Sequence, residues 1–357
     1  MSHSPHEIQE ILRHLHAGGS LGAPLAERFF ELTLSGQLND AQLGAILAII
    51  AARGADSAEV VAGVRVLRRH MTPLTLSSST APHETTDSPP IVLDTCGTGG
   101  APKVFNISTV AAFVVAAAAP GRVLVAKHGG RSRTGRGSAE VLQHLGANIH
   151  ASPALQVRCL RELGICFSFA PDHHPAMRHA LAARKSLGFP TIFNLVGPLA
   201  NPAGASHQLV GTFDPRAAHV LAQAMQQLGS QRAAIVTNPD GLDELTTTSV
   251  NDLLLVTQDS TSQRQIDPRE LGYSPPPLEH LRAHTLGDAA EAVHQVLDGA
   301  PGPRRDIVEL NAAAALWTAG AAPDLPAGLA SARDAILSRR AKSLFDRFCE
   351  LSRSDAP

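Results

Sequence analysis

A glycine-rich turn between a predicted strand and a predicted helix constrains this chain more than any other feature. The apolar run Pro90–Asp94 is typical of a buried strand, and the small-residue run Val110–Ala119 is typical of a packed helix. Positive φ and close approach of the backbone to a ligand are possible at three positions between them: Gly97, Gly99 and Gly100. Polar residues then stand at the helix start, where free N–H groups favour an anion such as phosphate: Asn106, Ser108 and Thr109. Taken alone, the turn fits a plain tight turn with capping residues equally well.

Composition narrows the class of protein. A chain of 357 residues with a formal net charge of −2 and no basic block argues against nucleic-acid binding through backbone electrostatics. The cysteines have no C-x-x-C spacing and are expected to be reduced thiols: Cys96, Cys159, Cys166 and Cys349. The longest fully apolar run, Val110–Ala119, is too short to cross a bilayer. We therefore expect a soluble cytoplasmic protein that binds no membrane and no nucleic acid.

The order of the predicted elements indicates two domains. Residues 1–75 show apolar residues at helical spacing and predict a small helical domain, and Asn39 or Asp40 and Gly54 are expected to bound one of its helices. Residues 76–90 are rich in Ser, Thr and Pro and predict a linker. Residues 91–357 alternate strands and helices, which predicts a larger α/β domain with a mainly parallel central sheet.

The elements expected in the larger domain follow from its apolar runs. Beyond the first strand we predict strands over Arg122–Ala126, Ile165–Phe169, Arg232–Thr237 and Leu253–Val256. We predict helices over Ser138–Leu145, Pro153–Leu163, His174–Leu187, Asp288–Leu297, Asp306–Ala319 and Leu329–Leu351. The polar region Asp259–Pro277 has no assigned element.

Three further segments carry chemistry. The loop from Lys127 to Glu140 follows a strand and is rich in arginine and glycine, which suits a polyanion at the carboxyl edge of the sheet or a solvated surface loop. The adjacent carboxylates of Asp243 and Glu244 suit Mg²⁺ or an acidic turn in water. Arg184 on a predicted helix suits a carboxylate ligand or plain solvent exposure.

Together these segments resemble the anthranilate phosphoribosyltransferase family. The likeness covers nearly the whole chain, from Ser35–Gln42 to Asn311–Leu316, and its most specific part is Thr191–Pro202. The resemblance implies a nucleoside phosphorylase/phosphoribosyltransferase type of fold, in which helices from about 172–190 join the helical domain. It implies transfer of the 5-phosphoribosyl group from 5-phosphoribosyl 1-diphosphate (PRPP) to the amine of anthranilate, in tryptophan biosynthesis. It also implies a homodimer formed through the helical domain.

The resemblance also assigns roles to residues. PRPP is expected to contact the two Gly-containing loops and the starts of their helices: Gly97, Thr98, Gly99, Gly100, Asn106, Ser108, Thr109, Lys127, His128, Gly129, Gly130, Arg131 and Ser138. Anthranilate is expected to contact Gly97, Gly130 and Arg184. Two Mg²⁺ ions are expected at Ser108, Asp243 and Glu244. An aromatic amine is unprotonated at neutral pH, so we expect no residue to act as nucleophile or general base.

The chain departs from the family pattern in both loops. Members normally have Asp where this chain has Ala101 and Asn where it has Gly130, and both loops are one residue shorter here. Glu140 stands where Asp is usual. We expect activity to remain, with a changed dependence on PRPP or metal. Two alternatives share the fold: a pyrimidine nucleoside phosphorylase-like enzyme and a non-catalytic relative that binds nucleic acid.

Overall fold

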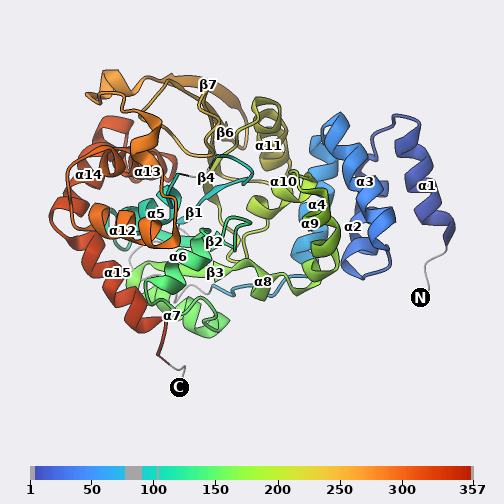
Figure 1. Ribbon diagram of the computed structural model, residues 1–357, viewed down its shortest axis with the longest axis horizontal. Helices are drawn as coiled ribbons and strands as arrows, with labels where there is room; N and C mark the ends of the chain where they lie inside the picture. Colours follow the sequence, from blue (N-terminus) through green and yellow to red (C-terminus); the bar gives the residue numbers. More distant parts are fainter. Residues whose placement is uncertain (1–4, 77–90, 103, 355–357) are drawn as a thin grey trace.

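The N-terminal part of the chain is a group of four helices. The computed structural model describes residues 5–76, 91–102 and 104–354, and Figure 1 shows the four helices in blue at one end of the molecule. They are α1 Pro5–His16, α2 Gly22–Leu34, α3 Asp40–Arg53 and α4 Ser57–Arg69. As predicted, Asn39 caps α3, since its side chain accepts from the Gln42 N–H at 2.9 Å, and Gly54 follows the last turn with φ of 88°.

The rest of the chain is built on one seven-stranded sheet with the order β3-β2-β1-β4-β5-β6-β7. The strands are β1 Ile91–Gly97, β2 Val123–Gly129, β3 Ile165–Phe169, β4 His207–Gly211, β5 Arg232–Thr237, β6 Asn251–Thr257 and β7 Thr261–Ile266. The first five are mutually parallel, while β6 and β7 pair antiparallel at one edge. The predicted mainly parallel α/β fold is therefore confirmed.

Helices cover both faces of the sheet and divide the apolar residues into two cores (Figure 1). One core joins the sheet to α5 Ile107–Ala118, α12 Leu286–Leu297, α13 Pro303–Thr318, α14 Leu325–Leu337 and α15 Arg340–Leu351. The other core runs from the opposite face through α10 Ile192–Leu199 and α11 Pro215–Gln227 into the four N-terminal helices. Because α4 contacts both α10 and α11, the four N-terminal helices pack directly against the helices that cover this face of the sheet.

Seven further helical elements complete the described chain. They are α6 Ser138–His144, α7 Pro153–Leu163, α8 Ala170–His173, the 3₁₀ helix η2 Pro175–Ala180, α9 Leu181–Leu187, and the 3₁₀ turns η3 Pro268–Leu271 and η4 Leu278–Leu281. Two of them, η2 and α9, contact α2 and α3, so this stretch lies beside the N-terminal helices. The predicted linker 76–90 lies outside the described residues except for Leu76. Division of the chain into domains at these positions stays a prediction.

Several predicted elements were wrong in extent. The single helix expected over His174–Leu187 is the 3₁₀ helix η2 followed by α9, since the first turn closes with an i→i+3 bond from the Met177 N–H to the His174 carbonyl at 3.0 Å. The helix expected over Leu329–Leu351 is two helices, separated where Arg339 takes φ of 65°. The strands β1 and β2 run three residues further than predicted, and β4, β7, α10 and α11 were not predicted at all.

Among the described residues, no helix is both long and apolar enough to cross a membrane.

Candidate active site

The glycine turn after β1 wraps around the carboxylate of Asp243. A Cβ on Gly97 would collide with Asp243 Oδ2, and the Gly99 N–H donates to that same oxygen at 3.0 Å. Gly99 and Gly100 have φ of 69° and 92°, so the turn requires residues without a side chain. On the neighbouring strand β4, a Cβ on Gly211 would collide with the Asp243 backbone. Glycines at the ends of β1 and β4 therefore leave the space that Asp243 occupies.

The three predicted metal-binding residues line one small cavity. Ser108, Asp243 and Glu244 line it with Thr95 and Asn311, and the rest of its lining is apolar: Cys96, Ala111, Leu209, Gly211, Val236 and Leu245. The described residues hold no group of three or more His, Cys, Asp or Glu side chains that could bind an ion unaided. Carboxylate and hydroxyl oxygens are the ligands that Mg²⁺ prefers, and Mg²⁺ commonly completes its shell with water and substrate phosphates. The residues present therefore fit Mg²⁺ shared with a phosphorylated ligand.

A buried cation lies next to this cavity. Lys127 is 5% exposed, and its Nζ donates to the Thr95 carbonyl and lies 3.4 Å from Ser108 Oγ. Its carboxylate neighbour Asp94 is fully buried and accepts from the His128 N–H at 3.2 Å and from Asn201 Nδ2 at 2.8 Å. Burial raises the pKa of Asp94, although the charge of Lys127 acts in the opposite direction. Lys127 and His128 thus belong to β2 and not to the loop where the sequence placed them.

Neutral imidazoles lie at the same end of β2. The rings of His128 and His174 are 5.2 Å apart, and both side chains are buried. Burial holds the pKa of His128 well below its usual value and lowers the pKa of His174 to about 4. His128 Nε2 has no hydrogen-bond partner among the described residues. An uncharged imidazole with one nitrogen unpaired among the described residues is therefore buried at this end of β2.

These pKa shifts predict a loss of stability in mild acid. A histidine whose pKa is depressed in the folded state contributes stability above its unfolded pKa of about 6.5, and this stability is lost as the pH falls towards the folded value. For His174 we expect about 2 kcal/mol of the unfolding free energy to be lost between pH 7.5 and pH 5. Urea unfolding of wild type and His174→Gln at both pH values measures this change in the unfolding free energy. We expect the variant to lose less unfolding free energy than wild type.

His219→Gln is the matched control for this measurement, because His219 is exposed on α11. It should show the wild-type loss of stability between the two pH values. A His174→Gln protein that loses as much as the control would contradict the prediction.

The loop 130–137 after β2 is held by the side chains around it. The Ser132 N–H donates to the Glu140 carboxylate at 3.2 Å, and Asn106 Nδ2 donates to the Arg136 carbonyl at 3.2 Å. Asn106 precedes α5, but its side chain does not cap that helix, and its amide is bonded to the loop instead. Arg131 lies over the Phe169 ring at 5.6 Å. The two glycine-containing loops thus meet through Asn106, at the carboxyl edge where open α/β sheets bind ligands.

Arg184 lies on the far side of these loops, on α9. Its guanidinium stands over the Phe193 ring at 5.3 Å, and burial lowers its pKa. Among the described residues it has no carboxylate within ion-pair distance. The next residue after Phe193, Asn194, donates to the Thr98 carbonyl at 2.9 Å. A half-buried guanidinium, unpaired among the described residues, is therefore linked to the glycine turn through Phe193 and Asn194.

The structure brings most predicted site residues together but leaves some separate. Ser138 lies against Gly129, since a Cβ on Gly129 would collide with its hydroxyl. Gly130 has an open approach, where an added Cβ would meet only Ala170 at 3.9 Å. Thr109 is buried in the first turn of α5. No contact joins Arg184 to Gly97 or Gly130 in the described part of the chain, so their shared role in acceptor binding stays a prediction.

Sequence reasoning gave no binding role to four polar residues that build the site. They are Asp94, Glu140, Asn194 and Asn201. Asn194 and Asn201 lie within Thr191–Pro202, the most specific part of the family resemblance, but received no role there. A buried asparagine in an apolar run is a usable signal, because such an amide must find partners.

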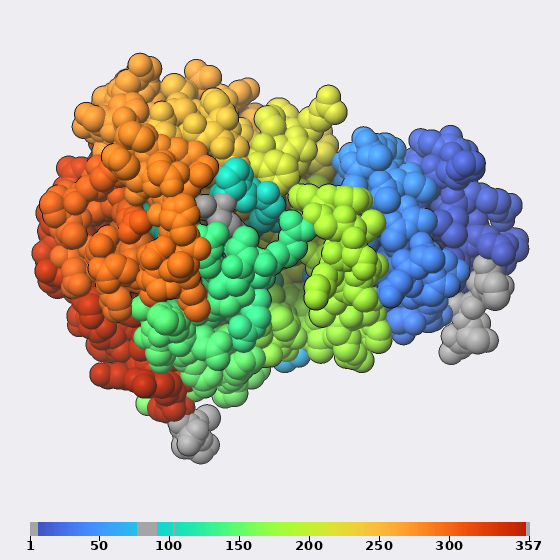
Figure 2. All heavy atoms as spheres, viewed as in Figure 1, coloured from blue at the N-terminus to red at the C-terminus, as the bar shows by residue number. Residues whose placement is uncertain are grey.

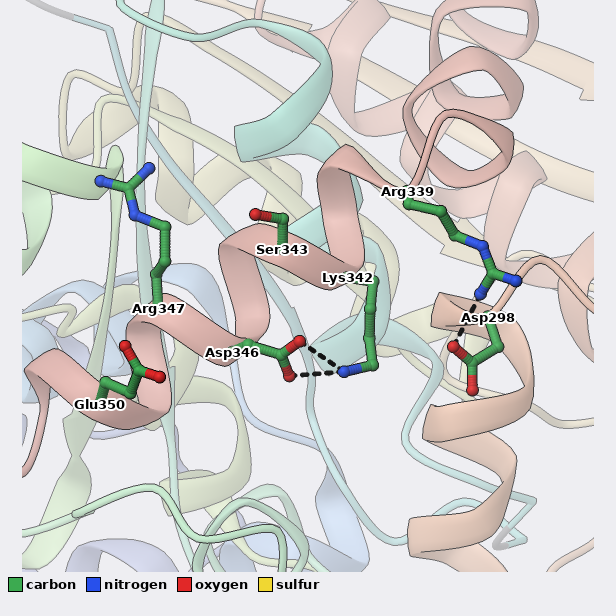
Figure 3. Close-up of a pocket in the computed structure, with 7 residues that line it drawn as sticks. All are labelled: Asp298, Arg339, Lys342, Ser343, Asp346, Arg347 and Glu350. Atoms are coloured by element: carbon green, nitrogen blue, oxygen red, sulfur yellow. Dashed lines mark hydrogen bonds and ion pairs between the residues drawn. The ribbon is translucent and has the colours of Figure 1, made fainter.

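A separate hollow on the surface offers no competing site. Figure 3 shows its charged side chains on and around α15, including Arg339, Lys342 and Asp346. Arg339 pairs with Asp298 at 2.7 Å, and Lys342 pairs with Asp346. Because these charges neutralise one another and no predicted site residue lies here, we place the functional site at the carboxyl edge of the sheet.

Comparison with known proteins agrees with this fold and site. Residues 9–71 match the helical bundle domain of the glycosyl transferase family, and residues 89–342 match its a/b domain. The fold and site therefore define a two-domain glycosyl transferase. The anthranilate phosphoribosyltransferase of Methylococcus capsulatus is 41% identical over 352 residues, which is 98% of this chain and 99% of the relative. The chain belongs to the anthranilate phosphoribosyltransferase family.

Solved structures show the same architecture. The crystal structure of anthranilate phosphoribosyltransferase from Thermus thermophilus superposes with a TM-score of 0.86 at 34% identity, covering 96% of this chain and 99% of that one. The Saccharomyces cerevisiae enzyme, solved in complex with PRPP and Mg, has a TM-score of 0.85 at 22% identity and covers 98% of each chain. At that identity the second likeness supports the fold alone.

Proposed function

We propose that this protein transfers the 5-phosphoribosyl group from PRPP to the amine of anthranilate, giving N-(5-phosphoribosyl)anthranilate and pyrophosphate in tryptophan biosynthesis. The observation that carries the proposal is the buried carboxylate of Asp243 inside the glycine turn. It brings an oxygen ligand for a metal to the strand end beside the buried Lys127, where in this proposal the phosphates of PRPP bind. Named relatives at 41% identity support the acceptor.

In this proposal the reaction exchanges one bond at C1 of the ribose. The amine nitrogen bonds to C1, the C1–O bond to the diphosphate breaks, and the amine proton is lost to the surrounding water or to pyrophosphate. Magnesium, held by Asp243, Glu244 and Ser108, would supply charge that stabilises the departing diphosphate. Lys127 adds a buried positive charge beside Ser108, and the loop 130–137 adds its arginines.

Arg184 receives the other end of the acceptor in this proposal. Its planar guanidinium is unpaired among the described residues and suits the anthranilate carboxylate in a bidentate contact. His128 is buried and neutral next to Lys127, so it adds no further charge to the site. No nucleophile or general base is needed, because an aromatic amine is already unprotonated at neutral pH.

The finer points of the proposal concern ions and assembly. We propose two Mg²⁺ ions, one shared with the diphosphate and one at the adjacent carboxylates, and a homodimer formed through the helical domain. Light scattering of the purified protein tests the dimer. A cytoplasmic location also stays part of the proposal.

The test is release of pyrophosphate from PRPP and anthranilate by the purified protein. We expect release that stops on chelation of metal and returns with added Mg²⁺, with a PRPP or metal dependence shifted by Ala101, Gly130 and the short loops. Absence of release at every Mg²⁺ concentration would contradict the proposal. Phosphorolysis of thymidine or uridine would instead identify a nucleoside phosphorylase, and salt-sensitive retention on DNA would indicate a nucleic-acid-binding relative.

A further inference from the structure

One arginine of the loop 130–137 reaches out of the loop to the helix that carries Arg184. The Arg133 guanidinium donates through Nη1 to the carbonyl of Gly188, the residue that ends α9. Figure 2 shows the green surface of the loop region meeting the yellow-green surface of the α9 region. The loop proposed to hold PRPP and the helix proposed to hold the acceptor are thereby joined.

The Gly188 carbonyl is a well-defined acceptor for this bond. Gly188 takes φ of 73°, a left-handed conformation that closes the helix, and its N–H donates to the Arg184 carbonyl at 3.4 Å. Arg133 is therefore hydrogen-bonded to Gly188, and Gly188 is in turn hydrogen-bonded to the backbone of Arg184. The Arg184 side chain stands over Phe193, so a shift of the end of α9 would move the guanidinium across that ring.

The other end of the link is equally fixed. The Ser132 N–H is held by Glu140, and the Arg136 N–H donates to Ser132 Oγ at 3.0 Å. A Cβ on Gly137 would lie 2.7 Å from two backbone atoms, the Gly130 carbonyl oxygen and the Ser132 nitrogen, as well as from Glu140 Oε2. The backbone of the loop is therefore closely packed against itself at Gly137. The backbone around Arg133 is thus constrained on both sides. A shift of this loop on ligand binding would therefore be transmitted to α9 through the Arg133 side chain.

We propose that Arg133 is a positioning residue that couples PRPP binding in the loop to acceptor binding at Arg184. In this proposal PRPP sets the position of the loop backbone, Arg133 carries that position to the end of α9, and anthranilate binds more tightly to the protein that already holds PRPP. Such coupling is a ratio of affinities and is reciprocal between the two ligands. The inference rests on the proposed function, because it takes PRPP and anthranilate as the ligands.

Calorimetric titration of anthranilate with and without saturating PRPP and Mg²⁺ measures the coupling. In wild type we expect PRPP to tighten anthranilate binding by about tenfold, and in Arg133→Met we expect this gain to fall by about fivefold, the upper end for an exposed charged contact. The KM for anthranilate should rise by a similar factor. Arg133→Lys, which keeps the charge and one donor, should recover part of the loss.

Arg131→Met is the matched control, because it removes the same charge from the same loop. Arg131 donates to Gln143 at 3.2 Å and does not reach α9 through any bond in the described part of the structure. It should raise the KM for PRPP while leaving the coupling to anthranilate intact. Equal profiles for the two variants, or an Arg133→Met coupling within twofold of wild type, would overturn the inference. A wild type that releases no pyrophosphate and binds neither ligand would instead show that the proposed function itself is wrong.

Discussion

Replacing Asp243 with asparagine is expected to lower the rate of pyrophosphate release by about 10²–10³-fold, the usual cost of removing one charged group that stabilises a transition state. Asparagine has the same shape and keeps a carbonyl oxygen that can accept the Gly99 N–H, so the turn should stay folded. What is lost is the negative charge that holds Mg²⁺ at the diphosphate. Initial rates over a range of Mg²⁺ concentrations measure the effect, and high Mg²⁺ should recover part of the rate.

Asp240→Asn is the control for this substitution. Asp240 lies three positions earlier in the same turn, but its carboxylate accepts from Ser249 Oγ at 2.9 Å and from Thr248, and it is absent from the lining of the cavity. It should keep a rate close to wild type. An Asp243→Asn enzyme as active as the Asp240→Asn enzyme would remove the metal site from the proposal.

The elements that could be predicted are those whose signals lie within a few residues. The helix α3 was predicted because Asn39 and Gly54 mark its ends, and β3 was predicted because Ile165–Phe169 is a continuous apolar run. The central strand β4 was missed because His207 and Gln208 read as polar. Its burial comes from pairing with β1 and β5, which lie far away in the sequence.

The same distinction holds for the site. The glycine turn and the adjacent carboxylates could be recognised as separate motifs, but nothing local places Asp243 between the ends of β1 and β4. That placement depends on Gly97 and Gly211, which clear the space from two strands more than one hundred residues apart in the chain. The bonds of Asp94 to His128 and Asn201 are likewise long-range. Residue types were therefore predictable, while their convergence required the sheet order.

The second large effect concerns the acceptor. Replacing Arg184 with methionine is expected to raise the KM for anthranilate by about 100-fold while leaving the KM for PRPP within about threefold, because a bidentate contact between guanidinium and carboxylate is lost. Methionine keeps an apolar stem against Phe193, so the packing of α9 should survive. Steady-state kinetics with each substrate varied in turn separates the two constants. Arg178→Met is the control, because among the described residues Arg178 bonds only within its own turn, to the Pro175 carbonyl at 3.2 Å.

An acceptor without a carboxylate makes this test sharper. Aniline offers the same amine but nothing for Arg184 to hold, so wild type should discriminate strongly against it, because the half-buried guanidinium would be left without its carboxylate. The Arg184→Met enzyme should lose most of that discrimination by becoming worse with anthranilate and little changed with aniline. If the variant instead loses the same factor with both acceptors, or if the KM values for PRPP and anthranilate rise together, then Arg184 supports the structure of the site and does not bind the acceptor carboxylate.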